Sequence, residues 1–206
     1  MDSGLLSLVA AAALLIAGFV ALTRSLSTRE IAAVASLGAL SAAGRVAFAA
    51  VPSVQPSTVL VIVAGWVLGP AAGFTVGATT GLVSNLFLGQ GPWTVWQMAC
   101  WATIGMIAGV LGKLPSKRPV RRIVAFSVAS GFLFGWAMDS WFWLSFVYPH
   151  TAGTFLVAIA TGLGFDAMHA VGNAVFAVLF AERAIALLGQ FRARMRVTYD
   201  EEPVHA

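Results

Sequence analysis

The sequence has few charged residues. Asp, Glu, Lys and Arg together make up only 10% of its 206 residues, whereas hydrophobic residues make up 59%. A soluble globular domain has about 25% charged residues, so this composition excludes a soluble fold. Because one helical membrane crossing takes about 20 apolar residues, the sequence predicts an all-α integral membrane protein with about six or seven crossings. Such a chain has no room for a soluble enzyme domain.

Cysteines and catalytic motifs are scarce as well. The single cysteine, Cys100, has no partner for a disulfide and stands in an apolar stretch, so we expect a small core residue. The sequence contains no Gly-x-Ser-x-Gly, His-Glu-x-x-His or Gly-x-x-x-x-Gly-Lys-Ser/Thr motif. We therefore expect no enzymatic activity and no cofactor. Any active transport must take its energy from an ion gradient or from another subunit.

The basic residues stand between the apolar runs and do not form one solvated face. The net charge of +4 therefore does not indicate a nucleic-acid partner. Lys and Arg that flank crossings remain in the cytoplasm, and the cluster from Lys113 to Arg122 is the strongest such marker. If this cluster is cytoplasmic and successive crossings alternate in direction, every Lys and Arg except Arg45 falls on the cytoplasmic side. The C-terminus falls on the same side.

The first apolar run, Leu5 to Leu22, has no basic residues before it, whereas Arg24 and Arg29 follow it. A signal peptide has the opposite arrangement. We therefore expect an uncleaved helix that runs from outside to inside and leaves the N-terminus external.

The later apolar runs predict crossings that alternate in direction. Pro52 and Pro56 break the chain after the second run, and Gly69-Pro70 makes a tight turn, with proline placed to start the next helix. These runs are 31–51, 57–68, 71–88, 95–111 and 123–146.

The last crossing is expected to start near Phe165, about 20 residues before Arg183. The stretch from Tyr148 to Leu163, which contains Gly162, is then an apolar outer loop with a short lid helix at the interface.

Small residues recur at every fourth position on several of these runs. Such stripes let helix backbones approach closely in lipid. Most of them are expected to pack within the bundle, and the stripe on the second run is also suited to receive a partner subunit. The stripes are Ala35, Ala39 and Ala43; Gly73, Gly77 and Gly81; Gly105 and Gly109; and Gly131 and Gly135.

Polar residues inside the apolar runs are functional candidates, because an ionisable group in lipid is costly unless it pairs or faces water. In the predicted topology these residues share one depth near the outer surface, as a binding cavity requires. The outer loops add aromatic and amide groups, which suit a planar, uncharged or weakly charged ligand. The predicted substrate-binding residues are Arg45, Gln55, Asn85, Gln90, Trp93, Trp96, Gln97, Asp139, Trp143, Asp166, His169 and Asn173.

Alternatives stay open for several of these residues. Arg45 either contacts the ligand or forms a buried pair with Asp139 or Asp166. His169 either contacts the ligand or is a hydrogen-bonded partner of Asp166 or Asn173, which share its helical face. The tryptophans either line the pocket mouth or anchor the chain at the interface. A metal site is not expected, because one histidine and one carboxylate fall short of the usual three or so protein ligands.

Several of these segments together resemble the substrate-binding (S) component of energy-coupling factor (ECF) transporters, the vitamin uptake systems of prokaryotes. The resemblance covers roughly residues 29–183. It is carried by Arg29-Glu-Ile-Ala-Ala-Val-Ala-Ser-Leu-Gly-Ala-Leu, Val54-Gln55-Pro56, Leu68-Gly69-Pro70-Ala71-Ala72-Gly73, Gly89-Gln90-Gly91-Pro92-Trp93, Gly164-Phe165-Asp166-Ala167-Met168-His169-Ala170 and Gly172-Asn173.

The resemblance implies a six-helix bundle in a prokaryotic inner membrane that binds a vitamin or its precursor from outside. It also implies a membrane coupling subunit and two ATPase subunits as partners, with the coupling subunit touching Ala35 and Ala39, and with them Ala43. The expected division is an extra N-terminal helix (1–28), the S-component-like bundle (29–188) and a cytoplasmic basic, then acidic, tail (189–206). The extra helix departs from the family pattern and has no assigned role.

The expected function is therefore a substrate-binding subunit for ATP-driven vitamin uptake, with cobalamin as the first candidate. An alternative is an ion-coupled secondary transporter of a small metabolite that uses Arg45 and the aspartates as a relay. The small size and the lack of a visible inverted repeat argue against it. A third alternative is an intramembrane enzyme with Asp166 and His169 as acid and base, but no nucleophile accompanies this pair.

Overall fold

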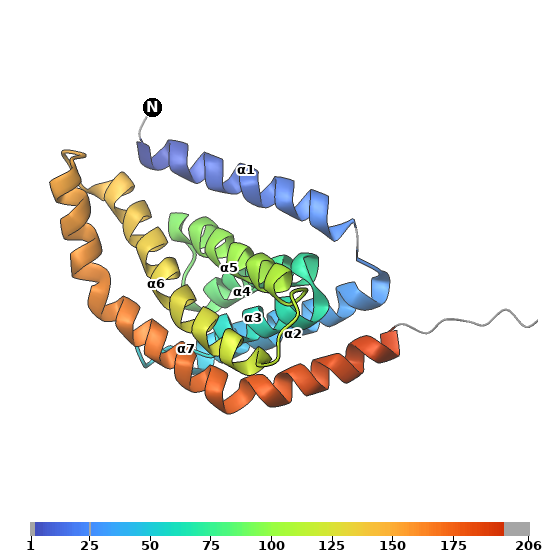
Figure 1. The fold of residues 1–206 in the computed structure, drawn as a ribbon. Helices are drawn as coiled ribbons and strands as arrows, with labels where there is room; N and C mark the ends of the chain where they lie inside the picture. Colours follow the sequence, from blue (N-terminus) through green and yellow to red (C-terminus); the bar gives the residue numbers. More distant parts are fainter. Residues whose placement is uncertain (1–2, 25, 196–206) are drawn as a thin grey trace, which may run out of the picture.

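The computed structural model describes residues 3–24 and 26–195, and this part of the chain contains seven α-helices and no strand. Six of the helices are long and apolar enough to cross a membrane, and α3, with 12 residues, is shorter. The predicted all-helical membrane fold is confirmed. The helices are α1 (Ser3–Thr23), α2 (Thr28–Ala47), α3 (Ser57–Leu68), α4 (Pro70–Leu88), α5 (Pro92–Leu111), α6 (Pro119–Phe146) and α7 (Ala152–Met195) (Figure 1).

Proline and glycine set the starts of the central helices. Pro70, Pro92 and Pro119 each occupy the beginning of a helix, where the missing N–H would have no partner within the helix. Gly69 has a φ of 104° between α3 and α4, a conformation that favours glycine. The chain therefore reverses direction within a single residue between these two helices.

The short helix α3 lies at the centre of the bundle. Most of its residues are buried, and they form one apolar cluster with side chains of α4, α5 and α7. Glycines allow the close approach: a Cβ at Gly105 of α5 would overlap the carbonyl oxygen of Gly73 in α4, and a Cβ at Gly65 of α3 would overlap that of Gly105. These glycine stripes pack within the bundle.

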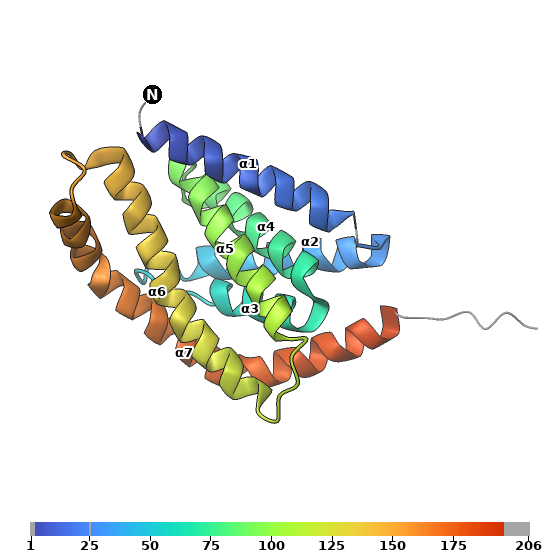
Figure 2. The same cartoon turned by 45° about the horizontal axis from the view of Figure 1, so that its top comes forward.

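The extra helix α1 packs beside the bundle, against α4, α5 and α6 (Figures 1 and 2). Ala11 and Leu15 face the bundle, and Ser3 Oγ donates a hydrogen bond to the Leu144 carbonyl at 2.8 Å. Its outer face is apolar, with Leu14 73% exposed. In a bilayer that face contacts lipid.

The expectation of an outer loop from Tyr148 to Leu163 is wrong. The helix α7 begins at Ala152 and continues through Gly162 and past Arg183 to Met195. It curves along α6 and then under the bundle (Figure 1). A glycine costs only about 1 kcal/mol in a helix, whereas breaking the helix within lipid would expose backbone groups that have no partner. The predicted tail beyond Met195 lies outside the described residues.

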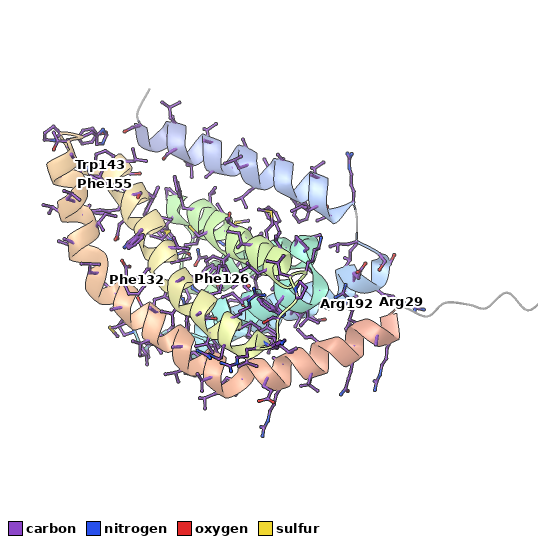
Figure 3. All side chains as sticks on the ribbon, in the orientation of Figure 1. Arg29, Phe126, Phe132, Trp143, Phe155 and Arg192 are labelled. Atoms are coloured by element: carbon purple, nitrogen blue, oxygen red, sulfur yellow. The ribbon has the colours of Figure 1, made fainter. Side chains whose placement is uncertain are left out.

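The two ends of the molecule differ in chemistry. Arg29 and Arg192 lie at one end, which we call the basic end, and Trp143 and Phe155 lie at the opposite end, which we call the aromatic end (Figure 3). Arg192 donates a hydrogen bond of 2.7 Å to the Val67 carbonyl, so the end of α7 is held against the end of α3.

We expect Gly105→Ala to lower the free energy of unfolding by about 1–3 kcal/mol, because its methyl group would force α5 away from the α4 backbone. Thermal unfolding of the purified protein in detergent measures this. Gly189→Ala is the matched control, since nothing lies within 4 Å of a Cβ at Gly189. Equal unfolding temperatures for Gly105→Ala and the wild type would contradict the close packing.

Candidate functional site

A polar cavity of about 430 Å³ opens between α2, α6 and α7. The segment after α2 and the ends of α4 and α5 complete its wall. This cavity, which we call the central cavity, contains both polar and aromatic groups. Its lining residues are Arg45, Phe48, Ala49, Val51, Ser53, Gln55, Leu88, Gln97, Phe134, Gly135, Met138, Asp139, Phe165, Asp166 and His169.

Arg45 of α2 is held by neutral polar groups of α4. One guanidinium nitrogen donates hydrogen bonds to Ser84 Oγ, at 2.7 Å, and to Asn85 Oδ1. Its guanidinium carbon lies 5.0 Å from the ring centre of Trp101 in α5. The guanidinium is therefore fixed in position while its charge is not cancelled by a carboxylate.

Asn85 links Arg45 to the start of α5. Its side chain is 1% exposed, and its amide nitrogen donates to Thr94 Oγ1 at 2.9 Å and to Gln97 Oε1 at 2.8 Å. These bonds orient the amide so that its oxygen accepts from Arg45. They also use the Gln97 oxygen and leave the Gln97 amide nitrogen for the central cavity.

Two aspartates form the opposite wall, on α6 and α7. Asp139 of α6 lies against Gly162 of α7, and Asp166 of α7 lies against Gly135 of α6, so that a Cβ at either glycine would overlap the facing carboxylate. Each aspartate follows the glycine of its own helix by four residues. This reciprocal arrangement places the two carboxylates about one helical turn apart on the same wall of the central cavity.

His169 lies one turn below Asp166 and bonds to α3. Its Nε2 is 2.9 Å from Thr58 Oγ1, which also accepts a hydrogen bond of 3.0 Å from Trp101 Nε1. Asn173 lies one turn further along α7 and donates to the Ser127 carbonyl at 3.0 Å. These two side chains therefore bond to α3 and α6, and Asn173 is not among the residues that line the central cavity.

The remaining predicted residues lie away from this cavity. Gln90 donates to the Leu82 carbonyl at 3.1 Å, and Trp93 donates to the Gly89 carbonyl at 3.4 Å, both at the exposed α4–α5 turn. Trp96 lines a second, apolar cavity of about 360 Å³ between α5 and α6. Trp143 donates to Thr154 Oγ1 at 3.0 Å and packs at the aromatic end.

Sequence reasoning missed the apolar part of the wall and the buried bonds beneath it. Phe48, Phe134 and Phe165 line the central cavity, and Thr58 and Trp101 support His169 and Arg45. A phenylalanine in an apolar helix does not stand out in the sequence as a site residue. Trp101 does stand out, because a buried indole N–H needs a hydrogen-bond acceptor.

The central cavity thus has a cationic side and an anionic side. Arg45 and Gln97 offer hydrogen-bond donors from α2 and α5, while Asp139 and Asp166 offer acceptors from α6 and α7. Aromatic rings lie between them. Such a site binds a small molecule by its polar ends and holds its body by apolar contact. No group of three His, Cys, Asp or Glu side chains in the described residues is placed to hold a metal ion.

Residues 29–188 match a known protein family that is described as the ECF transporter, substrate-specific component. No curated protein and no solved structure matches the chain. The matched span contains α2 to α6 and most of α7, and therefore every residue of the central cavity. Because the match covers well over half of the chain, this protein belongs to the family of substrate-specific components of ECF transporters.

Proposed function

We propose that the chain captures a vitamin or vitamin precursor from outside the cell and delivers it to partner subunits for ATP-driven uptake. The observation that carries this proposal is the central cavity, a small polar site within a helical membrane bundle of this family. Its opposed charged groups are suited to bind a solute.

The distribution of charge supports an outward-facing cavity. Arg45 is the one Lys or Arg of the described residues that lines this cavity, whereas Arg29 and Arg192 lie at the basic end. The positive-inside rule places that end in the cytoplasm. The aromatic end and the N-terminus are then external, and the C-terminus is cytoplasmic.

The volume of the central cavity favours a small substrate. Its 430 Å³ lies near the lower end of the range of about 300–1,000 Å³ for small-molecule sites. A vitamin with one or two rings fits this volume. A complete corrinoid such as cobalamin is larger and would have to project from the opening. Cobalamin therefore stays a candidate that ranks below smaller vitamins.

The face of α2 that carries Ala35, Ala39 and Ala43 supports docking of the coupling subunit. All three alanines are exposed, and small side chains allow a partner helix to approach closely in lipid. A groove of about 330 Å³ between Arg29 and Phe191 lies next to this face, at the basic end. We propose that the membrane coupling subunit covers this surface and that it brings the two ATPases.

Uptake is expected to depend on the partners. Cells that express the chain with the coupling subunit and both ATPases should accumulate a radiolabelled vitamin from a set that includes thiamine, riboflavin, biotin and cobalamin. Cells that express the chain alone should bind the vitamin without accumulating it. Full accumulation by the chain alone, driven by an ion gradient, would instead favour the secondary transporter.

Arg45→Gln is expected to weaken binding of the transported vitamin about 10- to 100-fold, because a charge-assisted hydrogen bond contributes about 1.5–3 kcal/mol. Equilibrium binding to the detergent-purified protein measures this. Arg121→Gln is the matched control, since Arg121 is exposed at the start of α6. Unchanged affinity in Arg45→Gln would limit Arg45 to holding α2 against α4.

Ala39→Leu is expected to abolish uptake while ligand affinity stays within about twofold of the wild type, because the larger side chain blocks close helix approach outside the central cavity. Co-purification with the coupling subunit and vitamin uptake measure the two effects. Ala129→Leu, an exposed position on α6, serves as the control. Normal uptake by Ala39→Leu would exclude this face as the docking surface.

A further inference from the structure

We infer that the substrate carries an organic cation, such as a protonated amine, that binds between Asp139 and Asp166, and an acceptor group that binds Arg45. This inference rests on the proposed function and specifies the substrate class. It differs from the expectation of an uncharged or weakly charged ligand. The difference comes from how α6 and α7 present their carboxylates.

The two carboxylates share one wall because the helices interlock. Gly135 and Gly162 make room for the facing Asp166 and Asp139, as described above, and Gly131 of α6 packs closely against Ala170 of α7. This register provides one glycine for each carboxylate. Both carboxylates line the central cavity.

One oxygen of each carboxylate has no hydrogen-bond partner among the described residues. The Oδ2 atoms of Asp139 and Asp166 are buried and accept no hydrogen bond among the described residues, and Asp166 as a whole is only 4% exposed. One guanidinium nitrogen of Arg45 donates to Ser84 and Asn85, and among the described residues Arg45 forms no ion pair with either carboxylate. A buried carboxylate without a counter-charge is costly. A ligand that supplies N–H donors and positive charge removes this cost.

The chemistry favours an organic cation over a metal ion. Calcium takes about six to eight oxygen ligands and zinc about four ligands, whereas this wall offers two carboxylates and the nearby His169 already bonds to Thr58. A protonated nitrogen needs only two or three acceptors. The rings of Phe134 and Phe165 also line the cavity and suit the body of an organic molecule.

The opposite wall selects the other end of the same molecule. Arg45 is fixed by α4, and the amide nitrogen of Gln97 is left free by its bond to Asn85. Both are donors, so they favour a carboxylate, phosphate or carbonyl group. A ligand with a cationic end and an acceptor end spans the central cavity from α6 and α7 to α2.

The test uses the full chain in detergent and a small-molecule extract of cells as the probe. The extract is divided on a strong cation exchanger at an acidic pH, where carboxylic acids are neutral, so that the retained fraction contains the organic cations and zwitterions. We expect the retained fraction to raise the unfolding temperature of the wild type. Asp139→Asn and Asp166→Asn should need about tenfold more of that fraction, or more, for the same rise.

Glu182→Gln is the control, because it makes the same acid-to-amide change at an exposed position of α7. Without ligand, the two asparagine variants should unfold at or above the wild-type temperature, since each removes an uncompensated buried charge. A merely structural role would instead lower that temperature.

The other outcomes separate this inference from the proposed function. If only the unretained fraction stabilises the wild type, or if the asparagine variants respond to the retained fraction like the wild type, the cation site is overturned and the proposed function stands. If neither fraction stabilises the wild type, the proposed function fails, and the inference fails with it.

Discussion

The close antiparallel contact between α6 and α7 is the constraint on which the central cavity depends. Gly135 and Gly162 allow the backbones to approach until each helix receives an aspartate of the other. A Cβ at either glycine would overlap the facing carboxylate and force it to move. The same contact keeps α7 helical through Gly162, because the intrahelical bonds satisfy the backbone while the glycine accommodates Asp139. Packing and ligand chemistry are therefore set by the same residues.

The wall formed by α2 and α5 differs, because its polar side chains form hydrogen bonds with polar side chains of the protein. Arg45, Ser84 and Asn85 form one hydrogen-bonded group that extends to Gln97. Within this group, the charged Arg45 is held in an apolar bundle by hydrogen bonds to neutral side chains. One wall is thus pre-organised by its internal bonds, and the other retains acceptors for a ligand. A substrate with a cationic end and an acceptor end would therefore lie across the cavity, from the aspartates to Arg45.

Most of the fold follows from local properties of the sequence. Apolar runs bounded by proline and glycine define α1 to α6 closely, because helix starts and reversals depend on a few neighbouring residues. The start of α7 did not follow, since Gly162 and Gly164 suggested a break. The helix propensity of glycine is low, so the local sequence favours a break at this point. That propensity contains no information on Asp139, which packs on Gly162 from a different helix.

For the site, the sequence by itself determined which rare polar residues stand within apolar helices, because hydrophobicity is encoded along the chain. Only the tertiary structure decided their partners. Arg45 bonds to Asn85 and His169 to Thr58, whereas Asp139 and Asp166 line the cavity, each with one oxygen that has no hydrogen-bond partner among the described residues. The tertiary structure also placed Trp96 and Trp143 away from the cavity. The reason is that hydrogen bonds and charge compensation depend on helix rotation and register, which long-range packing sets.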